Sequence, residues 1–222
     1  MRQQFLFAKG YRPLNHGSFG AFPKEVQEYQ RALQSETEAR PDTFIRCTYP
    51  NLLRESRSAL APLLGADVGE VVLVPNATTG VNTVLRNIPF LPGDVILYFS
   101  SIYGACENTI QSLSETCPVS SHKIDIVYPI DDDEIIRRFV SAVKNVTVER
   151  RRPKLAIFDT VLTFPGVRFP WEKLVAICKN LGILSLIDGA HGIGHIDLTH
   201  VGNVGPDFLI SNCHKYAHPR LY

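Results

Sequence analysis

The chain has 222 residues, of which 45% are hydrophobic and 20% charged, and its formal net charge at pH 7 is +1. This composition predicts a soluble globular protein with a sizeable core. The small net charge gives no broad field that would attract nucleic acid or an anionic membrane, and no apolar stretch approaches the roughly 20 residues of a membrane span. We therefore expect neither nucleic acid nor a membrane among its partners.

The five cysteines form no CxxC pair, and their odd number argues against a closed set of disulfides. The first fourteen residues carry three basic side chains and lack both the apolar core and the small-residue cleavage site of a signal peptide. Both observations favour a reducing compartment, and we expect a cytoplasmic protein.

The N-terminal part is predicted to be a loop followed by two helices. Glycines and polar residues indicate a loop over 14–23, and near-helical spacing of apolar residues predicts a helix over 24–39. A second helix is expected over 51–64, with Gly65 at its C-terminal end. We assign 1–60 to a separate N-terminal region that contributes to a dimer or to a small domain.

From residue 61 to 222, short apolar runs alternate with helical segments. The expected strands are 71–74, 95–99, 123–128, 154–158, 184–187 and 207–210, and the expected helices between them are 81–88, 103–116, 131–149 and 170–180. Apolar strands separated by helices indicate a mostly parallel sheet with helices on both faces, so the fold class is α/β. Ligands of such sheets bind at the carboxyl ends of the strands.

The first strand end offers an anion site. The segment Asn76-Ala77-Thr78-Thr79-Gly80 places hydroxyl and backbone N–H groups at the start of a helix, where a phosphate can bind. Plain capping of the helix by Asn76 or Thr78 is the alternative, and the residues alone leave the two open.

Further strand ends carry an aromatic ring, hydroxyls and an acid. Tyr103 follows the second run and could stack on a planar ligand or simply pack, and Thr163 lies beyond the fourth run. Asp188 ends the fifth run, and a buried aspartate needs a cation or several donors to stay ionised. An acid in that position could hold a ring nitrogen in its protonated form.

A lysine follows the last predicted strand, together with two other polar residues, Asn212 and His214. Lys215 lies on a turn beyond a buried strand, where a rigid backbone and partial desolvation would make its amine a nucleophile for Schiff-base chemistry. An anion site, a stacking face, an acid and an amine are the groups that pyridoxal phosphate (PLP) requires.

With these residues in place, the sequence resembles the class V aminotransferases, which have the aspartate aminotransferase fold (PLP fold type I). The resemblance spans roughly residue 14 to the end and depends most on Asp188-x-x-His191 and His214-Lys215. Segments 15–20, 40–42, 50–53, 76–78 and 212–215 are most similar to the isopenicillin N epimerase branch. Segments 158–161, 165–168 and 170–172 look more like its fungal members, which include hercynylcysteine sulfoxide lyases of ergothioneine synthesis.

The resemblance implies a large PLP-binding domain over 61–222 and a role for each candidate residue. Lys215 would carry the Schiff base, Ala77, Thr78, Asn212 and His214 would lie near the phosphate, Tyr103 over the ring, Asp188 at the ring nitrogen with His191 beside it, Thr163 near the phenolic oxygen, and Asn15 and His16 on the substrate side. Thr160 stands where many relatives have a histidine, a departure that bears on the substrate side.

The leading hypothesis is β-elimination from a cysteine sulfoxide conjugate, a small amino-acid substrate. Lys215 would remove the α-proton and Tyr103 would protonate the departing sulfur, so that pyruvate and ammonia result. Epimerisation or transamination at the same carbon is the alternative. The resemblance also implies a homodimer.

A further hypothesis is a PLP-binding fragment without turnover. The chain stops seven residues after Lys215, before the inserted antiparallel strand and the C-terminal domain that the resemblance implies.

Other chemistries have weaker support in the sequence. His191 and His195 are four residues apart, but the glycines between them make a poor helix and the glutamate of a zinc-protease motif is missing. Cys213 could be a thiol nucleophile, although packing is the favoured interpretation. The acidic run 131–134 suits a helix start better than a metal site, so no metal is expected.

Overall fold

The computed structural model describes residues 2–216 and divides into two compact units. The first unit comprises residues 1–73, 193–202 and 212–222, and the second comprises 74–192 and 203–211. The division of the chain at residue 60 predicted from the sequence, with its dimer or small-domain role, stays a prediction.

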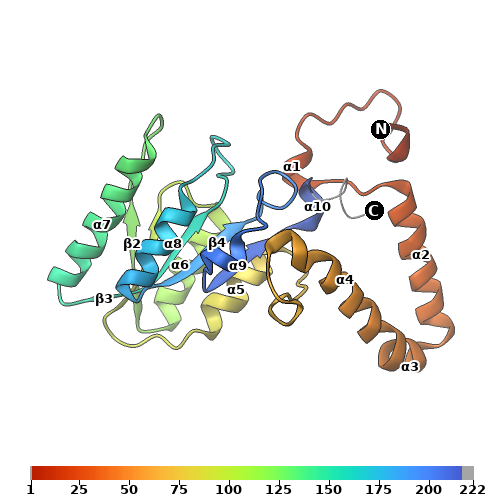
Figure 1. Cartoon of the computed structure of the whole chain (residues 1–222), viewed down its shortest axis with the longest axis horizontal. Coiled ribbons are helices and arrows are strands. Elements are labelled where there is room, and N and C mark those ends of the chain that lie inside the picture. The colour runs from red at the N-terminus through yellow and green to blue at the C-terminus, as the bar shows by residue number, and fades with distance from the viewer. Residues whose placement is uncertain (1, 217–222) are drawn as a thin grey trace. The chain divides into compact units, whose positions relative to one another are not determined.

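The second unit is built on a five-stranded sheet in the order β2-β1-β3-β4-β5, in which all neighbouring strands are parallel (Figure 1). The strands are β1 (Asp94–Phe99), β2 (Val119–Ile124), β3 (Arg152–Asp159), β4 (Leu184–Gly189) and β5 (Phe208–Ser211). The parallel α/β fold class predicted from the sequence is confirmed.

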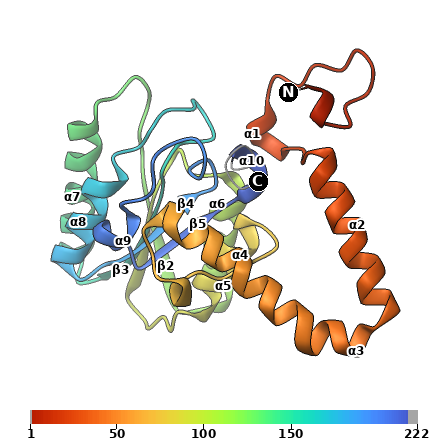
Figure 2. The ribbon, with the colours of Figure 1, turned by 45° about the vertical axis from the view of Figure 1, so that its right-hand side comes forward.

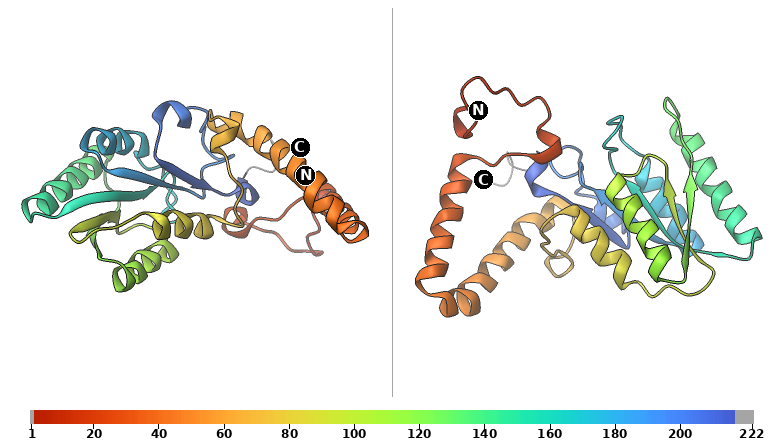
Figure 3. Two further views of the ribbon diagram at one scale, coloured as in Figure 1. Left: turned by 90° about the horizontal axis from the view of Figure 1, so that it is seen from below. Right: turned by 180° about the vertical axis from the view of Figure 1, so that it is seen from behind.

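Helices cover both faces of this sheet, with α5 and α6 on one side and α7 and α8 on the other (Figure 3, left). Their bounds are α5 (Ala77–Asn87), α6 (Gly104–Thr116), α7 (Asp132–Val148) and α8 (Trp171–Leu181), and the short α9 (Val201–Val204) precedes β5. Because successive strand residues point to opposite faces, Leu155 and Ile157 pack with α5 and α6. Phe158 points the other way and contacts Phe139 of α7.

The first unit contains two long helices, α2 (Lys24–Ala39) and α4 (Tyr49–Leu64), joined by α3 (Pro41–Thr43) and a π-helical turn η2 (Phe44–Thr48) (Figure 2). Its shorter elements are η1 (Arg2–Gln4), α1 (His16–Phe19), η3 (Val68–Glu70) and α10 (Cys213–Tyr216). Gly65 ends α4 in the left-handed conformation, as expected from the sequence. A small core around Leu60, Ala61 and Val71 includes Cys213, so α10 is anchored in this unit.

The helix predictions are close to the observed helices, since α2 has the predicted bounds and α6, α7 and α8 differ by one residue at most at each end. The prediction of a strand over 71–74 is wrong. This run pairs with no strand in the described part of the chain, and Val72 is 73% exposed. A β-branched run forms a strand only where another strand satisfies its backbone groups, so residues 2–216 contain five strands rather than six.

The predicted strand over 123–128 is also misplaced, because β2 lies four residues earlier, at Val119–Ile124. The centre of β2, Ser120-Ser121-His122-Lys123, is polar and has a low strand propensity. The apolar residues that follow it have a higher one, and the prediction therefore placed the strand there. At the edge of a sheet, polar side chains are tolerated because one side of the strand meets solvent. Residues 2–216 include no helix with both the length and the apolar character needed to cross a bilayer.

Gly80 allows α5 to approach β5 closely, since a Cβ atom there would lie 2.7 Å from Cγ2 of Ile210. We expect Gly80→Ala to lower the free energy of unfolding by about 1–3 kcal/mol through overpacking, despite the better helix propensity of alanine. Gly104→Ala is the matched control, because a Cβ there meets nothing within 4 Å. Chemical denaturation of both variants measures the difference, and equal stabilities would contradict this account of the packing.

Candidate functional site

Two acids lie side by side at the carboxyl edge of the sheet in the second unit. Asp159 ends β3 and is the register partner of Asp188 in β4. Both residues are buried, with exposed fractions of 4% and 3%. A carboxylate removed from water must be protonated, hydrogen-bonded or paired with a cation.

Asp188 is held by donors from two directions. The backbone N–H of Ala190 donates to its Oδ1 at 2.9 Å, and Sγ of Cys106 on α6 donates to its Oδ2 at 3.5 Å. Burial first, and then the charges of Asp188 and Asp159, raise the pKa of the Cys106 thiol far above its usual range. Cys106 therefore stays a neutral thiol and acts as a donor rather than a nucleophile.

The start of α5 lies in the same unit and has its first turn capped. Oδ1 of Asn76 accepts a hydrogen bond from the N–H of Thr79 at 2.8 Å, so the capping interpretation is confirmed. Capping does not exclude anion binding, because the positive end of the helix dipole and the hydroxyl of Thr78 remain at this terminus. Ala77 is buried and Thr78 half-buried at this position.

Three further candidates flank this edge. Tyr103 is the N-cap residue of α6 and is 47% exposed. Oγ1 of Thr163 lies 3.2 Å from Nε2 of His191, within hydrogen-bond distance. The structure thus brings together two residues for which the resemblance implies separate contacts with the ring.

Thr160 directly follows β3 and is fully buried, yet its Oγ1 has no hydrogen-bond partner within residues 2–216. An unsatisfied buried hydroxyl costs free energy unless water or a ligand completes it. Its position next to the two acids makes it a candidate ligand contact that the sequence analysis did not include among the site residues.

The remaining candidates belong to the first unit. Lys215, His214 and Asn212 follow β5 directly, and α10 packs against α1, which begins at His16 after Asn15. Burial, and then the charge of Lys215, lower the pKa of His214, so this imidazole is neutral at neutral pH.

Cys213 packs with the Leu60 core, and burial raises the pKa of its thiol. The structure thereby supports packing over a thiol nucleophile for Cys213.

The candidate residues thus divide between the units. The second holds Ala77, Thr78, Tyr103, Thr163, Asp188 and His191, and the first holds Asn15, His16, Asn212, His214 and Lys215. Their roles stay predictions. The sequence analysis did not assign a role to Asp159 or Cys106, although the alternation along 155–159 places Asp159 on the same face as Leu155 and Ile157. In the described part of the chain, no three His, Cys, Asp or Glu side chains gather closely enough to hold a metal ion.

The chain belongs to the class-V aminotransferase family, because the sequence model described as "Aminotransferase class-V" matches residues 25–220. The family predicted from the sequence is therefore confirmed.

Among curated proteins, the L-cysteine desulfhydrase-like protein lolT1 of Epichloe uncinata is 38% identical over 216 residues, which are 97% of this chain and 47% of that protein. The hercynylcysteine sulfoxide lyase of Schizosaccharomyces pombe is 33% identical over 220 residues, which are 97% of this chain and 54% of that protein. The chain thus spans about half the length of the curated relatives it matches.

Among solved structures, a mutant of C-DES with glycine covalently linked to its PLP cofactor matches with a TM-score of 0.79. The sequence identity is 20%, and the match covers 97% of this chain and 56% of that one. The chain therefore shares the fold of this PLP-binding protein.

The second unit fits PLP on three independent observations. Asp188 offers a buried carboxyl that could pair with a protonated ring nitrogen, the start of α5 has a positive dipole end that could bind a phosphate, and the unsatisfied Oγ1 of Thr160 offers a hydroxyl.

Gly20 determines how closely α1 can approach the lysine-bearing helix in the first unit. It has φ of +73°, and a Cβ there would collide with the backbone carbonyl oxygen of His214. We expect Gly20→Ala to lower the free energy of unfolding by about 2–4 kcal/mol, since strain and a backbone clash combine. We also expect it to weaken PLP binding by displacing Lys215.

Gly10→Ala is the matched control, because Gly10 has φ of +83° but open space around it. It should cost only the strain, about 1 kcal/mol. Thermal unfolding and titration with PLP measure both effects, and a Gly20→Ala variant no worse than Gly10→Ala would contradict the close approach.

Proposed function

We propose that this chain is part of a PLP-dependent carbon–sulfur lyase that performs β-elimination on a cysteine-derived amino acid. The observation that carries the proposal is the buried carboxyl of Asp188, held by a thiol and a backbone N–H at the end of β4, in a chain of this family. The proposed substrate is a cysteine sulfoxide conjugate such as hercynylcysteine sulfoxide, in an ergothioneine-type biosynthesis.

When bound, PLP withdraws electrons from the substrate carbon that loses its proton. Asp188 would keep the ring nitrogen protonated, and the start of α5 with the Thr78 hydroxyl would bind the phosphate. The amine of Lys215 would attach the cofactor and afterwards take the α-proton of the substrate. The hydroxyl of Tyr103 would give a proton to the departing sulfur, and hydrolysis of the remaining three-carbon fragment would yield pyruvate and ammonia.

The substrate class is supported by the names of two relatives. One is called L-cysteine desulfhydrase-like and the other a lyase of hercynylcysteine sulfoxide, so both names refer to cysteine or a derivative of it. Epimerisation or transamination would use the same lysine and acid and differ in where the proton returns. A cofactor-binding chain without turnover, a homodimeric assembly and a cytoplasmic location also stay predictions.

Replacement of the lysine tests the proposal. We expect the purified chain to develop the absorbance band of lysine-bound PLP, and borohydride to fix the cofactor covalently on the peptide that contains Lys215. Lys215→Ala should lose both signals, because no other amine would be positioned to replace it. Lys173→Ala is the control, since Lys173 is an exposed lysine paired with Asp133, and it should behave as wild type. A band that survives in Lys215→Ala would overturn the assignment.

Turnover is tested separately with cysteine sulfoxide conjugates, by measuring pyruvate release. Pyruvate that appears with wild type and disappears with Lys215→Ala supports the lyase. Inversion at the α-carbon without pyruvate would replace it with the epimerase alternative, and cofactor binding with neither product would favour the binding fragment.

A further inference from the structure

The alternation of side chains along β3 and β4 brings Asp159 and Asp188 to the same face of the sheet. Leu155 and Ile157 of β3 belong to the core under α5 and α6, and Asp159 continues that face two residues later. Leu186 of β4 belongs to the same core, and Asp188 continues it in register with Asp159. Adjacent strands are roughly 4.8 Å apart, so the two carboxyl groups are close neighbours.

Among the described residues, three groups interact electrostatically with Asp159. They are Asp188 on β4, the Cys106 thiol on α6 and the Tyr128 hydroxyl between β2 and α7. Burial, and then the charges of Asp132 and Asp159, raise the pKa of Tyr128 to about 12, so its hydroxyl is neutral at neutral pH.

The two acids have different surroundings. Asp188 accepts the hydrogen bonds of Ala190 and Cys106, which favour its ionised form. Among the described residues, no hydrogen bond is among the causes that shift the pKa of Asp159. Burial, and then the charge of Asp188, raise the pKa of Asp159 well above its ordinary value. Two neighbouring buried carboxyl groups cannot both ionise without a large cost, so the pair retains a proton.

We propose that Asp159 is the protonated member of this pair and Asp188 the ionised member, so that Asp159 limits the sheet edge to one negative charge. Asp159 is then a positioning residue. If the proposed function holds, that single charge matches the single positive charge of the protonated ring nitrogen of PLP. Asp159 would act through Asp188 and need not touch the cofactor.

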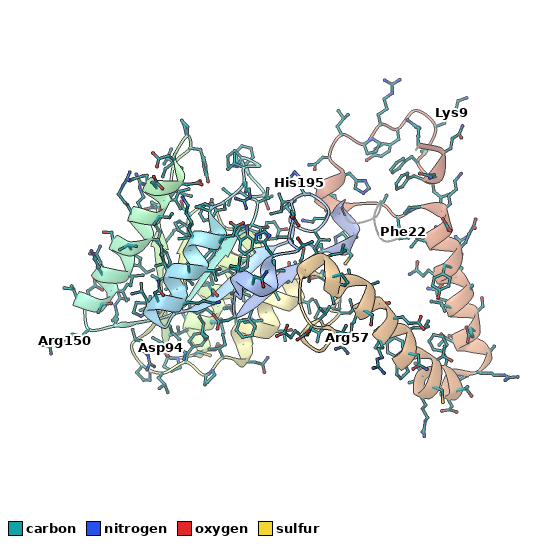
Figure 4. The ribbon with its side chains drawn as sticks, in the orientation of Figure 1. Lys9, Phe22, Arg57, Asp94, Arg150 and His195 are labelled. Atoms are coloured by element: carbon teal, nitrogen blue, oxygen red, sulfur yellow. The ribbon has the colours of Figure 1, made fainter. Side chains whose placement is uncertain are left out.

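Infrared spectroscopy of the cofactor-free chain tests the location of the proton. We expect a carbonyl stretch of a protonated carboxyl at neutral pH in wild type and its loss in Asp159→Asn. Asp94→Asn is the matched control for a buried aspartate of the same sheet, at the amino end of β1 (Figure 4). Burial alone would raise the pKa of Asp94, but hydrogen bonds from Arg152 and from the N–H of Leu91 lower it, so Asp94→Asn should leave the band unchanged. A band that is missing in wild type or persists in Asp159→Asn would overturn the proposal.

Stability against pH gives a second readout. Because the folded chain keeps the proton of Asp159 to a higher pH than the unfolded chain does, wild type loses stability as pH rises from about 4 to the folded pKa. The Asp159→Asn variant has no ionisable group at this position, so it does not lose this stability as pH rises. The melting temperature of the variant minus that of wild type should therefore increase between about pH 4.5 and pH 7.5. A constant or falling difference would contradict a protonated Asp159.

PLP affinity and the absorbance maximum of the bound cofactor test whether the two acids have different roles. Asparagine imitates a neutral acid in shape, so Asp159→Asn should keep the wild-type maximum and change affinity by less than about threefold. Asp188→Asn should lower affinity about tenfold or more, because a charge-assisted hydrogen bond is lost. Equal losses in the two variants would overturn the division of roles. Failure of PLP to bind wild type at all would instead refute the proposed function, while the infrared and pH results would still decide the protonation of Asp159.

Discussion

The burial of two carboxyl groups, those of Asp159 and Asp188, is the constraint on which the candidate site depends. Parallel pairing of β3 with β4 puts them side by side, and the apolar core under α5 and α6 continues up to them. Removal of a carboxylate from water is expensive, so each acid needs a proton, donors or a cation. The thiol of Cys106 and the N–H of Ala190 supply donors to one acid, and a retained proton would neutralise the other.

Close backbone approaches position the elements within each unit. In the second unit, Gly80 lets α5 lie against Ile210 of β5, which fixes the helix start proposed for the phosphate. In the first unit, Gly20 lets α1 lie against His214, and Cys213 anchors α10 in the Leu60 core. Lys215 therefore lies on a helix that contacts both α1 and the Leu60 core. A covalent cofactor attachment would require such a firmly held lysine.

Family membership identifies the scaffold, whereas the site geometry supports the proposed chemistry. The class-V aminotransferase match and the shared fold establish what kind of scaffold the chain forms. A scaffold alone does not define a reaction, because one fold supports many chemistries. The buried acid, the helix start and the lysine are the groups proposed to bind PLP. The names of two relatives refer to cysteine or a derivative of it, which supports carbon–sulfur chemistry as the proposed reaction.

The sequence by itself determined the alternating α/β order and most helix bounds to within two residues, although α5 begins four residues before its predicted start. It also predicted Asp188 and Lys215 as site residues, and their roles stay predictions. These follow from local patterns, namely side-chain periodicity, helix caps and polar residues placed after apolar runs. Only the tertiary structure decided that 71–74 pairs with no strand in the described chain, that β2 is the polar edge run, and that Cys106 reaches Asp188. Strand pairing and burial depend on partners distant in the chain, which no local pattern contains.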